Sequence, residues 1–185
     1  MAMSMFNRFR QDAARWVVPQ QIAPLEEITF GVMARLLYRY MPLRAMAWFR
    51  FGCWCSEHGI RGLPAMIQRR IYRHYGLEIG VGSDIEGGLY IAHPIGTVIS
   101  AEHIGTNCSI VAAVTIGMRN EHRFPWIGDN VFIGAGARVL GGIMIGDNAK
   151  IGANAVVIDD VAAGDTVVGM PAHSVRAHLL IDIPA

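Results

Sequence analysis

The sequence predicts a parallel β-helix over residues 77–172, preceded by a basic, mostly α-helical N-terminal module over residues 1–76. Three observations predict the β-helix. An aliphatic residue recurs every six positions, glycine often follows it at once, as in IGDNVF and IGANAV, and a small or turn-forming residue takes the fourth position of many hexapeptides. A helix repeats every 3.6 residues and a strand every 2, so a period of six favours the hexapeptide coils of a β-helix.

The aliphatic series defines the predicted coils, three hexapeptides to each. We expect its members to point inward and to stack on their counterparts one coil away, about 4.8 Å along the axis. They are Ile79, Ile85, Ile91, Val98, Ile104, Ile110, Ile116, Ile127, Ile133, Val139, Ile145, Ile151 and Val157. The fourth positions hold residues that tolerate positive φ, as tight corners require. These are Gly82, Gly88, Asn107, Asn130, Gly136, Gly142, Asn148, Asn154 and Asp160.

The six-residue phase breaks twice, and we place both breaks near His93. One extra residue lies between Ile91 and Val98, just after His93, and five extra residues lie in GMRNEHRFPW. An insertion in a coil leaves it as a loop, often on the binding face. We therefore expect an excursion loop over residues 117–126 and a C-terminal tail over residues 173–185.

The N-terminal module differs from the rest of the chain in charge. Residues 1–76 hold eleven arginines against four acids, a net charge of +7, whereas residues 77–185 carry −6. Residues 28–75 are predicted helical, with breaks at Pro42 and at GIRGLP. Either the apolar residues pack on the coils or a partner subunit, or the arginines and aromatic residues form a surface for an anionic membrane face. Nucleic acid is not expected as a partner, because the arginines mix with apolar residues and no recognition motif occurs.

Composition favours a cytoplasmic protein, with peripheral contact at the inner face of the cytoplasmic membrane as the alternative location. Three cysteines, an odd number, indicate a reducing compartment without a disulfide framework. No leader peptide is evident, and arginines interrupt the most apolar stretch, so a spanning helix is not expected. Cys53, Cys55 and His58 have a loose metal-like spacing, but we interpret these cysteines as buried thiols and expect no metal.

Four segments resemble a known family: IAHPIGTVI, VTIG, FIGAGARVLGGIMIGDNAKIGANAVV and VVGMPAHSV. Across roughly residues 70–176, the chain is similar to serine O-acetyltransferases and to the acetyltransferases of bacterial polysaccharide synthesis, including the colanic acid type. The resemblance implies a left-handed coil, acetyl-CoA as acyl donor, and a homotrimer. In the serine enzymes an N-terminal helical region pairs two trimers, which leaves a dimer of trimers open here.

The resemblance makes His93 the general base, held by a carboxylate fifteen residues upstream, here Glu78, where the serine enzymes usually carry aspartate. An imidazole can take the proton of a hydroxyl as its oxygen attacks a thioester, and a carboxylate on the other ring nitrogen orients it. The backbone N–H of Gly117 is the matching oxyanion donor. His122, in the excursion loop, is the rival base, and His103 is interpreted as a surface histidine. Direct transfer needs no acyl-enzyme, so Cys108 is expected in the core.

By the same resemblance, acetyl-CoA lies in a groove between two subunits with its thiol end near His93. Ala135 and Ala153 are small enough to admit the pantetheine arm close to the backbone. Lys150, the only lysine, is the candidate for the nucleotide phosphates, with a solvated surface lysine as the alternative. No GxxxxGK phosphate loop occurs.

The acceptor is expected to be a small molecule or a saccharide, bound by His122, Arg123 and Phe124. Serine enzymes carry aspartate before the base and Arg-His-Pro in the excursion, whereas this chain has Ala92 and Arg123-Phe124-Pro125. Loss of a partner for the serine ammonium, and the apolar faces of Phe124 and Trp126, favour a sugar hydroxyl of a capsule or exopolysaccharide unit. Serine is the alternative acceptor.

Two hypotheses other than acetyl transfer stay open. The repeat could be a scaffold that has lost its catalytic residues, or a zinc-binding β-helix of the carbonic anhydrase type. The latter needs three histidines in phase, and His93, His103, His122 and His173 do not share the phase.

Overall fold

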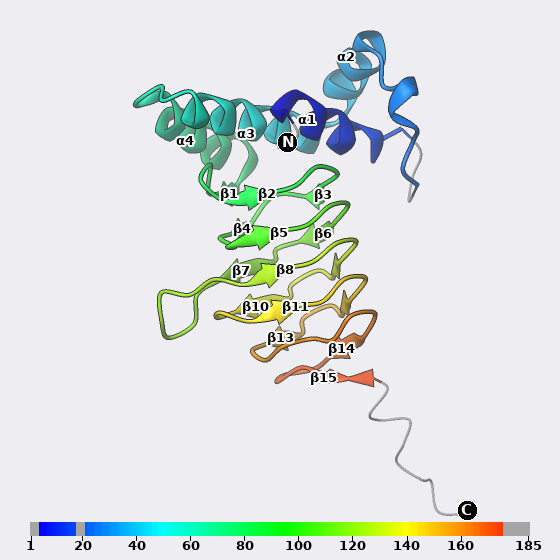
Figure 1. Ribbon diagram of the computed structural model, residues 1–185, viewed down its shortest axis with the longest axis vertical. Coiled ribbons are helices and arrows are strands. Elements are labelled where there is room, and N and C mark those ends of the chain that lie inside the picture. The colour runs from blue at the N-terminus through cyan, green and yellow to red at the C-terminus, as the bar shows by residue number, and fades with distance from the viewer. Residues whose placement is uncertain (1–3, 18–20, 176–185) are drawn as a thin grey trace, which may run out of the picture.

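The protein is a left-handed parallel β-helix of about five coils, with a layer of helices across its N-terminal end (Figure 1). The computed structural model describes residues 4–17 and 21–175. This architecture confirms the fold class that the six-residue period predicts. Of the predicted C-terminal tail, residues 176–185 lie outside the described residues.

The helices form a cap, which we call the helical cap and define as residues 4–17 and 21–75. It contains α1 (Met5–Ala14), α2 (Phe30–Arg39), α3 (Met41–Glu57) and α4 (Leu63–Tyr75), together with the short 3-10 helix Leu25–Glu27. Pro42 lies in the first turn of α3, where its missing N–H has no helical partner to lose. Gly76 ends α4 in the left-handed conformation, at φ 62°, and strand β1 begins at the next residue.

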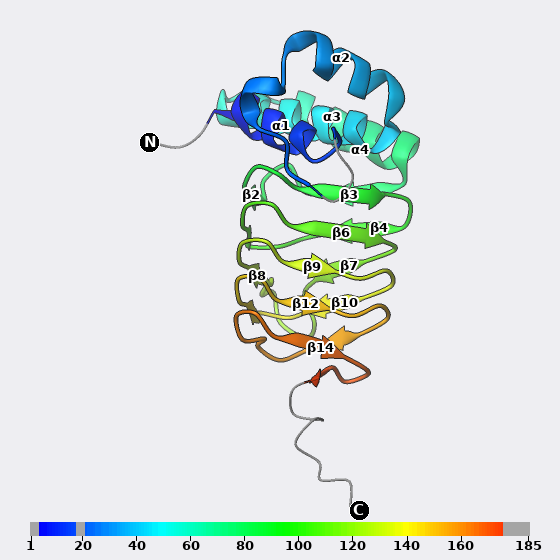
Figure 2. The ribbon, with the colours of Figure 1, turned by 90° about the vertical axis from the view of Figure 1, so that its right-hand side faces the viewer.

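The β-helix consists of three parallel sheets, which we call A, B and C (Figure 2). Sheet A holds β1 (Leu77–Ile79), β4 (Thr97–Ile99), β7 (Thr115–Gly117), β10 (Arg138–Leu140) and β13 (Val156–Val157). Sheet B holds β2 (Asp84–Ile85), β5 (His103–Ile104), β8 (Trp126–Ile127) and β11 (Met144–Ile145). Sheet C holds β3 (Tyr90–His93), β6 (Ser109–Ala112), β9 (Phe132–Ile133), β12 (Lys150–Ile151) and β14 (Thr166–Val168), and β15 (His173–Ser174) adds one antiparallel pairing to β14.

The core of the β-helix is the predicted aliphatic series, with one correction at the first phase break. Ile79, Ile99 and Ile116 are aligned in sheet A, and each is fully buried. The prediction that Val98 points inward is wrong. Val98 lies beside Ile99, is only half-buried, and faces outward opposite Glu78. The first break therefore adds two residues before Ile99, and the next step of the series is one residue shorter.

Positive φ angles mark the corners, again with corrections to the prediction. Six of the nine predicted positions have positive φ, namely Gly88, Asn107, Asn130, Gly136, Asn148 and Asn154. Gly82, Gly142 and Asp160 do not, and beside Gly142 it is Gly141 that takes φ 104°. The excursion loop packs on this turn, since a Cβ at Gly141 would meet Arg119 and a Cβ at Gly142 would meet Arg123.

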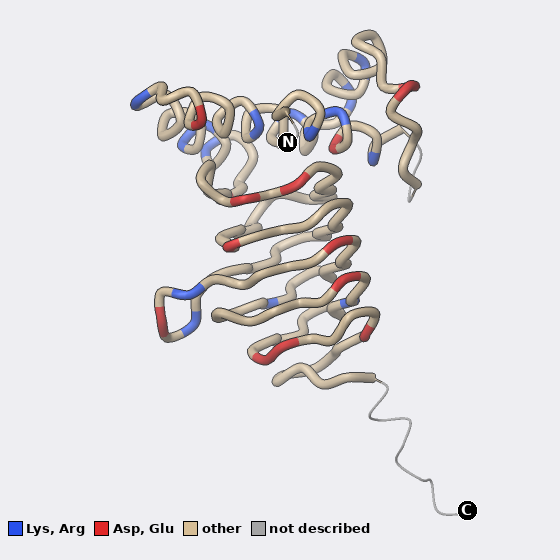
Figure 3. The backbone as a smooth tube through the Cα atoms, in the orientation of Figure 1, with Lys and Arg blue, Asp and Glu red and all other residues tan. Residues whose placement is uncertain are grey.

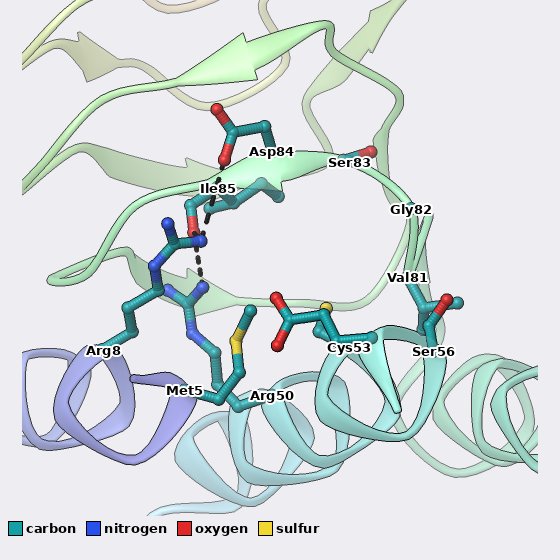
Figure 4. A pocket seen from close by; sticks show the side chains of 11 residues that line it. Met5, Arg8, Arg50, Cys53, Ser56, Val81, Gly82, Ser83, Asp84 and Ile85 are labelled. Atoms are coloured by element: carbon teal, nitrogen blue, oxygen red, sulfur yellow. Dashed lines mark hydrogen bonds and ion pairs between the residues drawn. The ribbon is translucent and has the colours of Figure 1, made fainter. Parts of the chain in front are cut away.

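The helical cap covers the open edge of the first coil with arginine side chains. Arg8 and Arg50 both donate to the Ile85 carbonyl, at 3.2 and 2.6 Å, and Arg15 donates to the Gly88 carbonyl at 3.2 Å. Figure 4 shows Arg8 and Arg50 reaching from α1 and α3 towards β2. An uncovered sheet edge exposes unpaired backbone groups. These contacts give the Ile85 and Gly88 carbonyls of the first coil their hydrogen-bond partners.

Candidate active site

His93 is the last residue of β3 and is exposed, at the corner where sheet C leads into sheet A. We call this the C–A corner and define it by the segments 93–96, 112–114, 134–137 and 152–155. His93 is paired with Ala112 of the next coil, and the buried Thr97 donates its hydroxyl to the His93 carbonyl at 3.4 Å. The backbone of His93 is therefore fixed on both sides while its ring is accessible.

Small residues continue the C–A corner away from His93. The amide of Gly136 donates to the Ala112 carbonyl, and the amide of Asn154 donates to the Ala135 carbonyl, both at 2.8 Å. A Cβ at Gly134 would lie 2.6 Å from the Ala153 amide nitrogen, so the successive coils touch here through backbone. The corner is thus lined by small residues, and the one long side chain among the described residues that bonds to its backbone is Arg138, which donates to the carbonyls of Ala113, Gly136 and Ala137.

Lys150 lies on sheet C near the same corner, exposed in β12 between Phe132 and Thr166. Strands β3, β6, β9 and β12 are successive neighbours, and Lys150 is in register with Phe132, Ser109 and Tyr90, so it lies three coil spacings, roughly 14 Å along the axis, from Tyr90. The predicted base and the predicted phosphate ligand therefore lie on the same sheet, but His93 is three residue positions further along its strand than the line of Lys150.

Glu78 does not contact His93. It is the outward residue of β1 on sheet A, and its side chain lines a hollow with Arg69 and Tyr72 of α4. No hydrogen bond or ion pair joins the two side chains in the part of the chain that the structure describes. The Gly76 carbonyl accepts a hydrogen bond from the Gly96 amide, which brings the start of β1 next to the turn after His93. Glu78 is thus near the C–A corner but on a different face.

Gly117 and the excursion loop occupy another corner, where sheet A leads into sheet B. We call it the A–B corner and define it by residues 117–125. Nothing lies within 4 Å of where a Cβ at Gly117 would be, so a ligand can approach this backbone closely. Arg123 packs its stem on Gly142 and lies 3.7 Å from Glu121, with both side chains largely exposed.

The two other loop residues predicted for the acceptor interact with each other. The rings of His122 and Phe124 meet edge to face, with their centroids 5.1 Å apart. Trp126 does not join them: it lies in β8 on sheet B, where its ring is stacked on His103 at 5.0 Å. Only one apolar ring of the predicted pair, Phe124, therefore belongs to the loop.

The predicted site residues fall into two groups within one chain. His93 and the small residues line the C–A corner, whereas Gly117, His122, Arg123 and Phe124 belong to the A–B corner, and sheet A lies between them. A base at one corner and acceptor contacts at the other can meet only if the corners of two chains are brought together.

One histidine–carboxylate pair was missed by the sequence analysis. His103 Nδ1 lies 2.7 Å from Asp84 Oδ2 across neighbouring strands of sheet B, and Arg8 is 3.7 Å from the same carboxylate. The spacing of nineteen residues is the only sequence signal, because it is one coil plus one residue. This pair lies on the outer face of sheet B, where Trp126 is stacked on the His103 ring. It is therefore away from the C–A corner, where the small residues lie.

The thiols do not contribute a nucleophile. Cys53, Cys55 and Cys108 are all buried and free, which confirms their interpretation as core residues. Burial raises the pKa of Cys108 to about 12, and its thiol lies 3.1 Å from the Gly128 carbonyl. Burial likewise raises the pKa of Cys53 to about 11 in the pocket between α3 and the first coil (Figure 4). That pocket contains none of the predicted site residues, and no three His, Cys, Asp or Glu side chains among residues 4–17 and 21–175 group as a metal site.

Comparison with known proteins agrees with the fold. The family described as bacterial transferase hexapeptide (six repeats) matches residues 124–159. A serine acetyltransferase of Staphylococcus xylosus is 47% identical over 105 residues, which are 55% of this chain and 49% of that protein. Soybean serine acetyltransferase complexed with serine is 34% identical with a TM-score of 0.78, over 93% of this chain and 70% of that one.

A further solved structure, a serine acetyltransferase in complex with CoA, is 30% identical with a TM-score of 0.77, over 93% of this chain and 70% of that one. The chain spans about half the length of the curated relatives it matches first. By its repeats, its coils and its identity to proteins of which it covers more than two thirds, the chain belongs to the hexapeptide-repeat acetyltransferase family.

Proposed function

We propose that this chain is an acetyl-CoA-dependent O-acetyltransferase of the serine acetyltransferase type, with His93 as its general base. The observation that carries the proposal is the C–A corner, where an exposed imidazole heads a row of small residues on a fold shared with serine acetyltransferases. The sequence analysis favours a sugar acceptor, and the relatives favour serine instead.

The proposed reaction is a single acyl transfer. His93 takes the proton of the acceptor hydroxyl while its oxygen attacks the thioester carbonyl. The tetrahedral intermediate carries its negative charge on the former carbonyl oxygen, and a backbone N–H, for which Gly117 is the candidate, donates to it. When the carbon–sulfur bond breaks, the imidazolium returns its proton to the leaving thiolate, so the products are an O-acetyl ester and CoA.

The proposed course of acetyl-CoA follows the C–A corner. With the thioester at His93, the pantetheine arm passes Ala112, Ala135 and Ala153, whose side chains leave room close to the backbone. Lys150 is the candidate for the nucleotide phosphates, since it lies on the same sheet three coils from β3, roughly 14 Å along the axis, a span that needs an extended arm. The CoA complex of a relative supports this donor.

The proposed assembly is a homotrimer with the three β-helices side by side. Its support is the division of the site between two corners of one chain, since the A–B corner of one subunit must meet the C–A corner of the next to complete it. In this arrangement Arg123 and Phe124 of the excursion loop act on the acceptor bound near His93 of the neighbouring subunit.

Two residues of the chain, Ala92 and Phe124, favour a second class of acceptor, a sugar. Where the resemblance places aspartate before the base and a histidine after the loop arginine of the serine enzymes, this chain has Ala92 and Phe124. Without those groups the ammonium of serine loses a charged partner, and Phe124 offers an apolar face that suits a sugar ring. We therefore keep a sugar hydroxyl as the second candidate.

The test is acetyl-CoA turnover over a panel of acceptors, followed by release of the CoA thiol and by mass spectrometry of the product. We expect serine to give O-acetylserine, with His93-dependent turnover. Faster acetylation of a free sugar or sugar nucleotide would replace serine by the second candidate. If no acceptor yields an ester and acetyl-CoA does not bind, the proposed function is wrong.

A further inference from the structure

We propose that the helical cap is a docking surface for an anionic lipid bilayer, with α2 as the element that enters the headgroup region. The surface consists of five exposed aromatic residues, which we call the outer aromatic surface: Phe6, Phe30, Tyr38, Phe51 and Trp54. The acetyl-transfer site does not use any of them.

Exposed apolar side chains concentrate on the cap. Ten of the seventeen large hydrophobic residues that are exposed among the described residues lie before residue 76, although the cap is the smaller part of the chain. Phe30 is 78% exposed and Tyr38 is 90% exposed, one at the start and one near the end of α2. Scattered single residues would need no explanation, but a gathering of this kind marks an interaction site.

Two ring contacts and one groove connect four of the five residues of the outer aromatic surface, and Tyr38 is the fifth, near the end of α2. Phe6 and Phe30 are stacked at 5.8 Å, and Phe51 and Trp54 are stacked at 6.0 Å. An apolar groove between α1 and α3 is lined by Phe6, Phe51 and Trp54 and so joins the two pairs. The surface therefore extends from α3 across α1 to the first turn of α2.

The arrangement of α2 is that of a helix lying on an interface. It buries Met33 and Leu36 against the rest of the cap and leaves Phe30, Arg35, Tyr38 and Arg39 exposed. In Figures 1 and 2, α2 lies on the side of the cap remote from the β-helix. None of the helices that the structure describes could span a bilayer.

The positive charge of the helical cap favours an anionic partner. The structure uses Arg8, Arg15 and Arg50 on the first coil and Arg10 on the Leu25 carbonyl. The other seven arginines are exposed: Arg35, Arg39, Arg44, Arg61, Arg69, Arg70 and Arg73. Among the acids of the cap itself only Glu26, Glu27 and Glu57 are exposed, because Asp12 is buried in an ion pair, while Arg69 shares a hollow with the exposed Glu78 of β1. Figure 3 shows this separation, with blue on the cap and red along much of the β-helix.

An anionic bilayer complements this surface, whereas a second copy does not. Two caps placed face to face would bring like charges together, which costs free energy, while anionic lipid headgroups attract each arginine. Aromatic and arginine side chains are also those that favour the boundary between headgroups and acyl chains. If the chain forms the proposed trimer, three caps lie at one end of the assembly, and their lipid affinities reinforce one another.

The test is flotation of the full chain with vesicles of phosphatidylcholine, with and without phosphatidylglycerol. We expect binding to the anionic vesicles, little binding to the neutral ones, and release at high salt because surface charges are screened. The double substitution Arg35→Gln with Arg39→Gln should weaken binding about fivefold per arginine. Phe30→Ser with Tyr38→Ser should weaken it roughly tenfold or more.

Met144→Ser is the matched control, because Met144 is 58% exposed on sheet B, away from the cap, and should bind vesicles as the unmodified chain does. Equal binding to neutral and anionic vesicles, or equal binding by all variants, would overturn the proposal. The proposal would also be overturned if the unmodified chain had the mass of two trimers in solution and the Phe30/Tyr38 variant had the mass of one. The surface would then cover a second copy. Acetyl-CoA turnover in lipid-free solution is measured beside each assay: it tests the proposed function and should be unchanged by all these substitutions.

Discussion

Asp12 of α1 and Arg50 of α3 form a buried, two-pronged ion pair at the junction of the cap and the β-helix. Arg50 Nε lies 2.8 Å from Asp12 Oδ2, Nη2 lies 3.0 Å from Oδ1, and the side chains are 0% and 3% exposed for Asp12 and Arg50. Asp12 Oδ1 also accepts the amides of Gly88 and Leu89 at 2.9 Å each. Burial alone would lower the pKa of the Arg50 guanidinium, but the charge and hydrogen bonds of Asp12 outweigh it and raise that pKa.

Replacing Asp12 is expected to destabilise the protein strongly. In Asp12→Ala the Arg50 charge stays buried without its partner, and two backbone amides lose their acceptor, which together cost about 3–5 kcal/mol of unfolding free energy. The measurement is urea unfolding followed by circular dichroism, at one protein concentration because assembly contributes to stability.

Glu121→Gln is the control for that experiment. Its pair with Arg123 is 3.7 Å long, both side chains are over 70% exposed, and such pairs contribute little. A loss for Asp12→Ala as small as that for Glu121→Gln would contradict the role of the buried pair.

His93→Ala should abolish acetyl transfer without changing the fold. Loss of a general base lowers turnover by about 10²–10⁴-fold, while an exposed corner side chain contributes little to the core. His103→Ala is the matched control, because it removes the one histidine that the structure pairs with a carboxylate among the described residues, on a different face. The opposite result, with His103→Ala inactive and His93→Ala active, would move the base to sheet B.

Ala92→Asp is expected to report the acceptor. If serine is the substrate, a carboxylate beside His93 supplies a partner for its ammonium and should raise kcat/KM for serine roughly tenfold or more. If the acceptor is a sugar, the same substitution places a charge against an uncharged ring and should lower kcat/KM. The variant is compared with the unmodified chain over both acceptors at saturating acetyl-CoA, and equal kinetics would remove Ala92 from the site.

The solenoid was predictable because its core positions carry the period directly. Away from the two breaks, each inward residue of the series is an aliphatic side chain six positions after the last, and glycines and turn-forming residues repeat with the same spacing. Where coil length departs from eighteen, the period no longer tells which residue points inward, and for this reason Val98 was chosen over Ile99. The His103–Asp84 pair was missed for the same reason, since nineteen residues separate its members.

The helical cap was predictable only in part. Helix α1 escapes detection because its buried face is Arg8, Asp12, Ala13 and Ala14, which do not form an apolar stripe. Its polar contacts include backbone groups of the first coil and the side chains of Arg50 and Glu86, and no periodicity reports these. The spacing of fifteen placed Glu78 near the corner of His93, but it could not show that β1 turns that carboxylate towards α4.

A large side chain at Ala153 should block acetyl-CoA. Ala153→Phe fills the C–A corner along which the pantetheine arm is proposed to run, so KM for acetyl-CoA should rise roughly tenfold while KM for the acceptor changes little. Ala163→Phe is a matched control: Ala163 is exposed, and its amide approaches Gly146 in the next coil as that of Ala153 approaches Gly134, but at the corner between sheets B and C. Equal effects of the two substitutions would mean that CoA does not follow the C–A corner.

The thiols should be silent in the folded protein and reactive after unfolding. Burial raises the pKa of Cys108 to about 12 and that of Cys53 to about 11, so the reactive thiolate is scarce near neutral pH as well as inaccessible. Titration with Ellman's reagent at pH 8 should therefore give no rapid release from the native chain and three equivalents in urea, matching its three cysteines. Because the folded state holds these protons more tightly than the unfolded chain, stability should be fully present below the ordinary thiol pKa and should fall as pH rises from there towards 12. A rapid native equivalent, or stability that increases over this range, would contradict the burial of these side chains.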